Sequence, residues 1–274
     1  MNKLVKNPVT FFGVIISLIM IFTGIFAPLI SPYPYQELHL KDKLKPPCEK
    51  YWLGTDQFGR DILSRIIYGT RVSLLVGLGG TLIGMLFGIF WGSVAAFYGK
   101  WVDDAIMRVV DVMMSFPYIV IAVGLVSVFG PGLFKLIMIV GFLRIPEFAR
   151  ITRGPILVLK EMPFVEAAKA IGQADWKILF KHILPNCLMV IFVYASLSIA
   201  TAIRVEASLS FLGLGIQPPA PSWGLMLADG RQYIIYATWL TTFPGIAISL
   251  TILGFNLVSD GLRDILDPRL RRAQ

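Results

Sequence analysis

Few residues of this 274-residue chain have the types and spacing that catalysis or metal binding requires. The two histidines, His39 and His182, stand alone, and we interpret each as an interfacial or hydrogen-bonded residue. The two cysteines, Cys48 and Cys187, form no CxxC motif and no His/Cys cluster, so neither a metal site nor a disulfide is expected. The chain also lacks a GxxxxGK[ST] phosphate loop. The sequence therefore predicts no catalytic, cofactor or metal site in this chain.

The residues that could do other chemistry lie in a short, charged segment from Pro163 to Pro185, between long apolar runs. Its first half has apolar residues at the spacing of one helix face: Phe164, Ala167, Ala168 and Ile171. Gly172 interrupts this pattern, and Asp175 follows where a helix N-cap is expected. The second half repeats the stripe with Trp176, Leu179, Phe180 and Ile183. We predict two short helices joined at the glycine.

An amphipathic helix pair of this kind can bind in a groove of a soluble partner. Glu166, in the first turn, is favourably placed at the positive end of the helix dipole, and it could also pair with a basic residue of the partner. Alternatively, the pair packs beneath its own helices, with Glu166 in solvent. The periodicity leaves both interpretations open.

The composition predicts that membrane-spanning helices position this segment. Hydrophobic residues make up 56% of the chain, charged residues only 15%, and the mean hydropathy is +0.72; soluble chains are about a quarter charged. Its net charge of +8 is not clustered on a soluble face, so no nucleic-acid partner is expected. We predict six helical spans: Phe11 to Ile30, Val72 to Gly99, Val112 to Phe134, Leu136 to Leu143 and on toward Arg150, Leu188 to Ile203, and Tyr233 to Ser259.

The distribution of Lys and Arg predicts the orientation of these spans. Fifteen basic residues lie on the side of the 163–185 segment, including Lys3, Lys6, Arg263 and the RLRR tail after Asp267, and ten lie on the other. The segment and both termini are therefore expected in the cytoplasm. In the first outer loop, Asp61 to Arg71 is predicted as an interfacial helix with an Asp61–Arg65 pair.

The charged residues between the second and third spans are interpreted as structural. An inner-loop cluster is interpreted as a solvated helix cap, with a second partner contact as the alternative: Asp103, Asp104, Arg108 and Asp111. No buried carboxylate is expected, because the second, third and sixth spans carry no charge. That absence disfavours an ion-coupled carrier, which usually needs ionisable groups near the bilayer midplane. A transport chain without its own energy source must then be driven by a partner protein.

Glycines recur every four residues in the second span: Gly80, Gly84, Gly88 and Gly92. Such a strip lets a neighbouring helix approach closely in lipid. The alternative is that the strip lines a moving pore. We favour close packing.

Four blocks of sequence resemble the permease subunits of ATP-binding-cassette importers, in the peptide and nickel branch. Glu166-Ala167-Ala168, Gly172 and Leu184-Pro185 resemble the EAA loop of that family. The other blocks are LGTDQFGRDILSRIIYGTR from Leu53, EASLSFLGLGIQPPAPSWG from Glu206, and FNLVSDGLRDILDP from Phe255. Together they span most of the chain in the family's order.

This resemblance implies an all-α, six-helix permease fold of the type I importers, with residues 1–71 as the first span and outer loop and 72–274 as the core. Its EAA loop, within 150–186, would be the coupling helix on an ATPase: Val165, Glu166, Ala167, Ala168, Ala170, Gly172, Leu184 and Pro185. The implied location is the inner membrane. The implied partners are a second permease subunit, two ATPase subunits that bind the ATP and Mg²⁺, and an external substrate-binding protein. Peptides are the expected substrate. Nickel or a metal chelate, an ion-coupled carrier and a membrane-anchor subunit are the alternatives.

Overall fold

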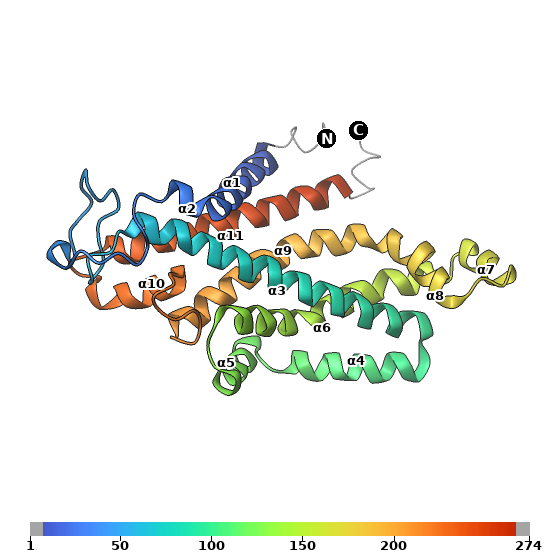
Figure 1. Cartoon of the computed structure of the whole chain (residues 1–274). Coiled ribbons are helices and arrows are strands. Elements are labelled where there is room, and N and C mark those ends of the chain that lie inside the picture. The colour runs from blue at the N-terminus through green and yellow to red at the C-terminus, as the bar shows by residue number, and fades with distance from the viewer. Residues whose placement is uncertain (1–7, 267–274) are drawn as a thin grey trace.

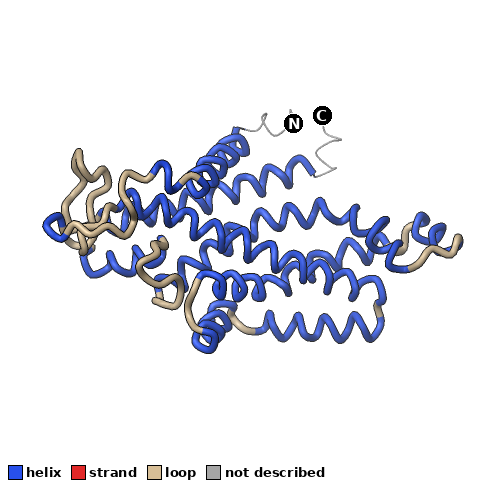
Figure 2. The backbone as a smooth tube through the Cα atoms, viewed as in Figure 1, coloured by secondary structure: helices blue, strands red, loops and turns tan. Residues whose placement is uncertain are grey.

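The chain folds into an elongated bundle of helices. The computed structural model describes residues 8–266, and every regular element in that range is helical (Figure 1, Figure 2). One end, here called the loop end, carries the irregular residues 31–61 and α10 (Trp223–Gly230). The opposite end, the α7 end, carries α7 (Pro163–Ala170). The start of α1 and the finish of α11 both face the α7 end (Figure 1).

Five long helices form the body: α1 (Pro8–Ile25), α3 (Ile62–Tyr98), α6 (Leu133–Leu159), α9 (Leu184–Phe211) and α11 (Trp239–Leu266). Shorter elements connect or extend them: α2 (Ala27–Ile30), η1 (Leu40–Asp42), α4 (Lys100–Ser115), α5 (Tyr118–Phe129), α8 (Asp175–Lys177), the π-helical turn η2 (Ile178–Ile183) and η3 (Arg231–Tyr233). The all-helical fold predicted from the sequence is confirmed for the described residues.

Length and hydropathy identify four helical stretches in the described chain that could each cross a membrane: Pro8–Ile25, Ile62–Tyr98, Asp175–Phe211 and Trp239–Asp264. The bent pair α4 and α5 would be a fifth if both helices are counted as one span. The predicted count of six is therefore not reached by this criterion. The predicted fourth span lies in α6, which continues to Leu159 and also carries Arg144, Glu147, Arg150 and Arg153.

The predicted third span, Val112 to Phe134, is wrong as a continuous helix. Its first residues end α4, and α5 begins after Pro117 at an angle of 90°. Proline has no backbone N–H, and it disfavours helical geometry in the residue before it, here Phe116. Gly130 has a positive φ of 78° and ends α5 before Phe134 is reached.

The outer part of α3 also differs from the sequence expectation. Asp61 to Arg71 is not a separate interfacial helix, because α3 runs unbroken for 37 residues and contains the boundary expected at 71/72. The predicted Asp61–Arg65 pair is also wrong. Asp61 caps α3 by accepting a hydrogen bond from the Ser64 N–H at 2.8 Å, and Arg65 instead lies 3.7 Å from the Asp56 carboxylate. Likewise, α9 continues past Ile203 to Phe211.

The glycine strip of α3 faces α6. Gly80, Gly84, Gly88 and Gly92 are all buried. A Cβ atom at Gly84 would lie 2.3 Å from the Arg144 Cβ, and one at Gly88 would lie 2.7 Å from the Ile145 carbonyl oxygen. Both distances are too short for real atoms, so only glycine permits this backbone separation.

Several basic residues on which the predicted orientation rests lie outside the described range, as does Asp267 before the tail: Lys3, Lys6, Arg269, Arg271 and Arg272.

Candidate docking site at the α7 end

Local sequence explains how α7 begins and ends. Pro163 occupies its first turn, where the missing N–H is not needed and the fixed φ suits a helix. At the other end, the Gln173 N–H donates to the Ala168 carbonyl and the Gly172 N–H to the Lys169 carbonyl. This pair of bonds is a Schellman motif, which requires a left-handed residue, and Gly172 has φ of +73°. The predicted turn therefore lies at Gly172.

The second half of the 163–185 segment joins directly to α9. The helix starts at Asp175, passes through the π-helical turn and continues as α9, with Pro185 in the first turn of α9. Asp175 is not the N-cap that the sequence predicted. Ala174 holds that position, because the helix begins one residue earlier than the pattern indicates, and its methyl side chain makes no capping bond.

The apolar residues of this segment divide into two sets. One set is buried against the ends of α3, α6 and α9 and includes Val165, Ala168, Ile178, Leu179 and Ile183, which pack with Ala96, Ile156 and Cys187. The other set remains exposed: Phe164 at 41%, Ile171 at 82%, Trp176 at 61% and Phe180 at 45%. Most of the face predicted as one stripe is thus uncovered by this chain.

The charged residues of α7 lie on the same uncovered surface. Glu166 is exposed in the first turn and has no hydrogen bond or ion pair among the described residues. Lys169 is exposed in the last turn. Lys177 lies over the Trp176 ring with its Nζ 5.5 Å from the centroid. A surface that combines exposed aromatic and aliphatic side chains with free charges can bind a protein groove.

Ion pairs between α4 and α6 support this end of the bundle. The Arg153 Nε donates to Asp103 at 2.7 Å, and Arg150 pairs with Asp111. The interpretation as a solvated cluster is therefore wrong for Asp103, whose side chain is 14% exposed, whereas Asp111 is paired but remains exposed. The other two members of the cluster, Asp104 and Arg108, are exposed.

At the loop end, the structure contains buried carboxylates that the sequence analysis did not expect. Glu206 on α9 is fully buried and accepts hydrogen bonds from Ser73 Oγ at 2.9 Å and Ser210 Oγ at 2.8 Å. Asp56 is 4% exposed and binds Arg60 and two backbone N–H groups. Ser73 lies 133 residues from Glu206, so no local pattern could indicate their contact.

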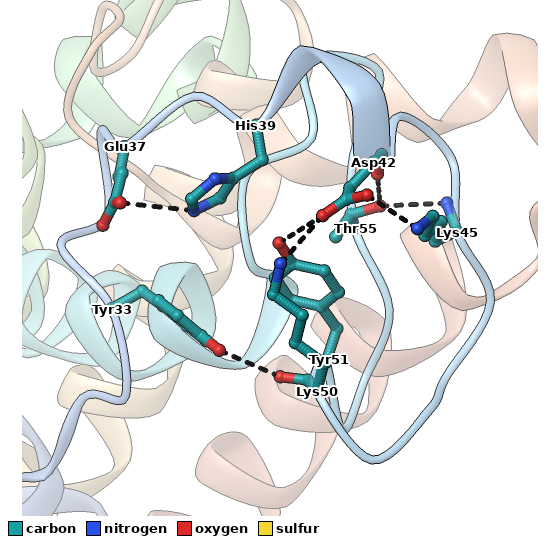
Figure 3. A network of polar contacts seen from close by, with 8 residues as sticks. All are labelled: Tyr33, Glu37, His39, Asp42, Lys45, Lys50, Tyr51 and Thr55. Carbon is teal, nitrogen blue, oxygen red and sulfur yellow. Dashed lines mark hydrogen bonds and ion pairs between the residues drawn. The ribbon is translucent and has the colours of Figure 1, made fainter.

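A second polar network connects residues of the loop end (Figure 3). The Asp42 carboxylate accepts from Lys50 Nζ at 3.0 Å and Tyr51 Oη at 2.8 Å, and Lys45 Nζ lies 2.6 Å from it. Hydrogen bonds from Lys45, Lys50 and Tyr51 hold the pKa of Asp42 well below its usual range. His39 lies 3.3 Å from Glu37 in the same network.

The two histidines and two cysteines lie far apart, at the two ends of the bundle. His182 lies in the π-helical turn at the α7 end. Cys48 is exposed at the loop end, whereas Cys187 is buried near the start of α9, and both are free thiols.

Two family models match the chain. Residues 84–272 match the binding-protein-dependent transport system inner membrane component. Residues 1–47 match the N-terminal TM domain of oligopeptide transport permease C.

Relatives with names align along nearly the whole chain. A dipeptide transport system permease protein of Alkalihalophilus pseudofirmus is 44% identical over 98% of this chain and 89% of its own. A glutathione transport system permease protein of Pectobacterium atrosepticum is 44% identical, covering 93% and 85%. A di/tripeptide transport system permease protein of Pseudomonas aeruginosa is 39% identical, covering 95% and 88%.

A solved structure shares the fold. A chain of the inward-facing MetNI methionine ABC transporter superposes with a TM-score of 0.61 at 17% identity, covering 74% of this chain and 97% of that chain.

Proposed function

The chain belongs to the family of binding-protein-dependent transport system inner membrane components, and from that premise we propose that it is a pore-forming permease subunit of an ATP-binding-cassette importer for peptides. The α7 end then lies in the cytoplasm and the loop end outside. The relatives described above are named for dipeptides, di- and tripeptides and glutathione, and none of the three for nickel. Peptides are therefore favoured over nickel or a metal chelate.

The uncovered surface of the 163–185 segment is the observation that supports a partner protein as the energy source. Burying Ile171, which is 82% exposed, against a partner contributes on the order of 1–2 kcal/mol. The buried set, Val165 and Ala168 among it, fastens the same segment to α3 and α6. A partner that moves α7 thereby moves the bundle. Glu166 and Lys169 supply charges of both signs for pairing with that partner.

The proposed assembly contains a second permease subunit, two ATPase subunits and an external substrate-binding protein. ATP and Mg²⁺ bind to the ATPase subunits, and this chain's part is to transmit their closure through α7. The pore then alternates between inward-facing and outward-facing states, a two-state equilibrium that the partner's nucleotide shifts.

An ion-coupled carrier is the alternative from another class of transporter. The sequence argues against it by the absence of buried carboxylates, and Glu206, buried near the loop end of α9, weakens that argument. Family membership now weighs against it instead. A membrane-anchor role is disfavoured by the same family membership.

The test is to separate ATP hydrolysis from uptake in the assembled importer. Glu166→Ala and Gly172→Val should leave insertion intact while peptide uptake falls relative to ATP hydrolysis. Glu161→Ala is the matched control, because Glu161 is an exposed glutamate just before α7 and should have no effect. Wild-type coupling in both test variants, or peptide uptake driven by an ion gradient without ATP, would refute the proposal.

A further inference from the structure

The exposed surface of α9 changes character along its length. On α3, from Leu75 onward, every exposed side chain is apolar or aromatic: Leu75, Leu78, Leu82, Leu86, Phe87, Phe90 and Tyr98. On α9, the half nearer the α7 end is similar from Met189 onward, with Met189, Val190, Phe192 and Leu197 exposed. Toward the loop end, the same face carries Thr201, Arg204 and Ser208 instead.

Arg204 is an exposed arginine inside a membrane-spanning helix. It precedes the last residue of α9, Phe211, by seven positions, or about 10 Å along the axis. Its single hydrogen bond among the described residues is a long one, 3.5 Å, to Thr201 Oγ1, and no carboxylate pairs with it in the described chain. A guanidinium in contact with hydrocarbon costs several kcal/mol, so such residues usually face a polar cavity or a partner.

A cavity of about 480 Å³, widely open at the surface of the chain, lies beside Arg204 and is lined by residues of α5, α9, α10 and α11. Its lining includes Tyr118 at the start of α5, Ser208 and Phe211 on α9, and Ile248 on α11. None of the described residues that line it is acidic. At its rim, the Arg231 guanidinium lies over the Phe211 ring, 5.9 Å from the centroid. The cavity is therefore basic and partly apolar, and the Tyr118 hydroxyl lines it, whereas the Ser208 hydroxyl donates to the Arg204 carbonyl.

We propose that this cavity is a substrate subsite on the translocation path, in which Arg204 binds a carboxylate of the transported peptide. Arginine binds carboxylates bidentately with two parallel N–H···O bonds, and the Tyr118 hydroxyl adds a donor from α5. Apolar residues such as Leu227 and Ile248 accommodate an adjoining side chain. This inference rests on the proposed import of peptides.

The test compares a peptide carrying a free C-terminal carboxylate with its C-terminal amide in the reconstituted importer. Both are supplied at concentrations that saturate the binding protein, so that the uptake rates report translocation. Wild type should prefer the free acid. Arg204→Gln should reduce that preference by about tenfold or more, because a charged hydrogen bond is lost, and Arg204→Lys should retain part of it. Arg71→Gln, an exposed arginine of α3 outside this cavity, should behave as wild type.

A second measurement does not depend on uptake. In a variant lacking Cys48 and Cys187, Ser208→Cys should react faster with an anionic than with a cationic methanethiosulfonate reagent, and the free-acid peptide should slow the reaction. Adding Arg204→Gln should abolish the charge preference. An Arg204→Gln importer that keeps the wild-type preference, or a Ser208→Cys thiol that no reagent reaches, overturns the subsite.

Two further outcomes also overturn it. Labelling that is slowed by anionic lipid and not by peptide assigns Arg204 to a headgroup. Loss of the second permease subunit from the Arg204→Gln complex assigns it to an interface. Failure of the proposed function is distinct from both, because wild type would then take up neither peptide.

Discussion

The two ends of the bundle differ in which side chains they bury within the chain. At the loop end, charged groups are buried and paired within the chain: Asp56 with Arg60 and Arg65, and Glu206 with Ser73 and Ser210. At the α7 end, large apolar groups remain exposed, from Trp101 at 76% to Ile171 at 82%. Buried polar groups are stable only when hydrogen-bonded, and exposed apolar clusters are stabilised by a partner.

The contrast concerns the buried charges. The loop end folds around its own network of paired charges, although it too exposes large apolar side chains, such as Trp52 at 71% and Ile235 at 90%. The α7 end leaves its apolar side chains for another protein to bury. Substitutions at the loop end should therefore lower the free energy of unfolding, whereas those on the exposed face of the α7 end should change coupling alone.

The largest loss of stability is expected for Asp56→Ala. This carboxylate, 4% exposed, is the partner of Arg60 and lies 3.7 Å from the buried Arg65. Its removal leaves buried cations unpaired, at a cost of roughly 3–5 kcal/mol. SDS titration of the unfolding transition in mixed micelles measures the change. Asp104→Ala, at an exposed aspartate of the α7 end, is the control, and equal losses in the two variants would contradict the contrast.

Glu206→Ala should have the next largest effect. It removes the acceptor of the Ser73 and Ser210 hydroxyls from a fully buried site, at a cost of about 1–3 kcal/mol. Glu206→Gln keeps one acceptor oxygen and should lose less. The same unfolding titration separates them. If Gln were as damaging as Ala, the carboxylate charge rather than the hydrogen bonds would be what the site requires.

The sequence predicted the helical body better than its interruptions and ends. Apolar runs locate the spans because each must bury its backbone polar groups in its own hydrogen bonds. They do not indicate that α3 continues outward from Arg71 to Ile62, since its outermost turns are stabilised by contacts such as Arg65 with Asp56. The break at Pro117 was visible in the sequence, but the surrounding hydropathy outweighed it.

The candidate site was located by its motif, but its buried face was not. Helical spacing groups Phe164 with Ala168, and the structure buries only Ala168 of these two. Which face packs is decided by Ala96 and Ile156, on helices distant in sequence. Glu206 was missed for the same reason, because its partner Ser73 comes from another helix.

A smaller, pH-dependent effect is expected in the loop network. The pKa of Asp42 is lowered by Lys45, Lys50 and Tyr51, so its contribution to stability is present above the ordinary aspartate pKa of about 4 and is lost as the pH falls through the lower, folded-state value. The hydrogen-exchange protection of residues 42–55, taken relative to the intrinsic exchange rate at each pH, should thus stay high down to about pH 4 and fall only below it. Asp42→Asn should exchange faster at neutral pH and lose this acid dependence. An unchanged profile in Asp42→Asn would mean that other contacts hold the loop.

The smallest change in stability, and the sharpest test of the contrast, is Ile171→Ser. Ile171 is 82% exposed, so the substitution should alter the unfolding free energy by less than about 0.5 kcal/mol. Ile178, of the same type and seven residues later, is fully buried, so Ile178→Ser should cost several kcal/mol. If a partner covers the exposed face, Ile171→Ser should nevertheless weaken ATPase binding to the permease complex about tenfold, measured by co-purification over a concentration series. Unchanged ATPase binding would show that the exposed apolar face of the α7 end is not the docking surface, whereas a large loss of stability would show that the chain itself covers Ile171.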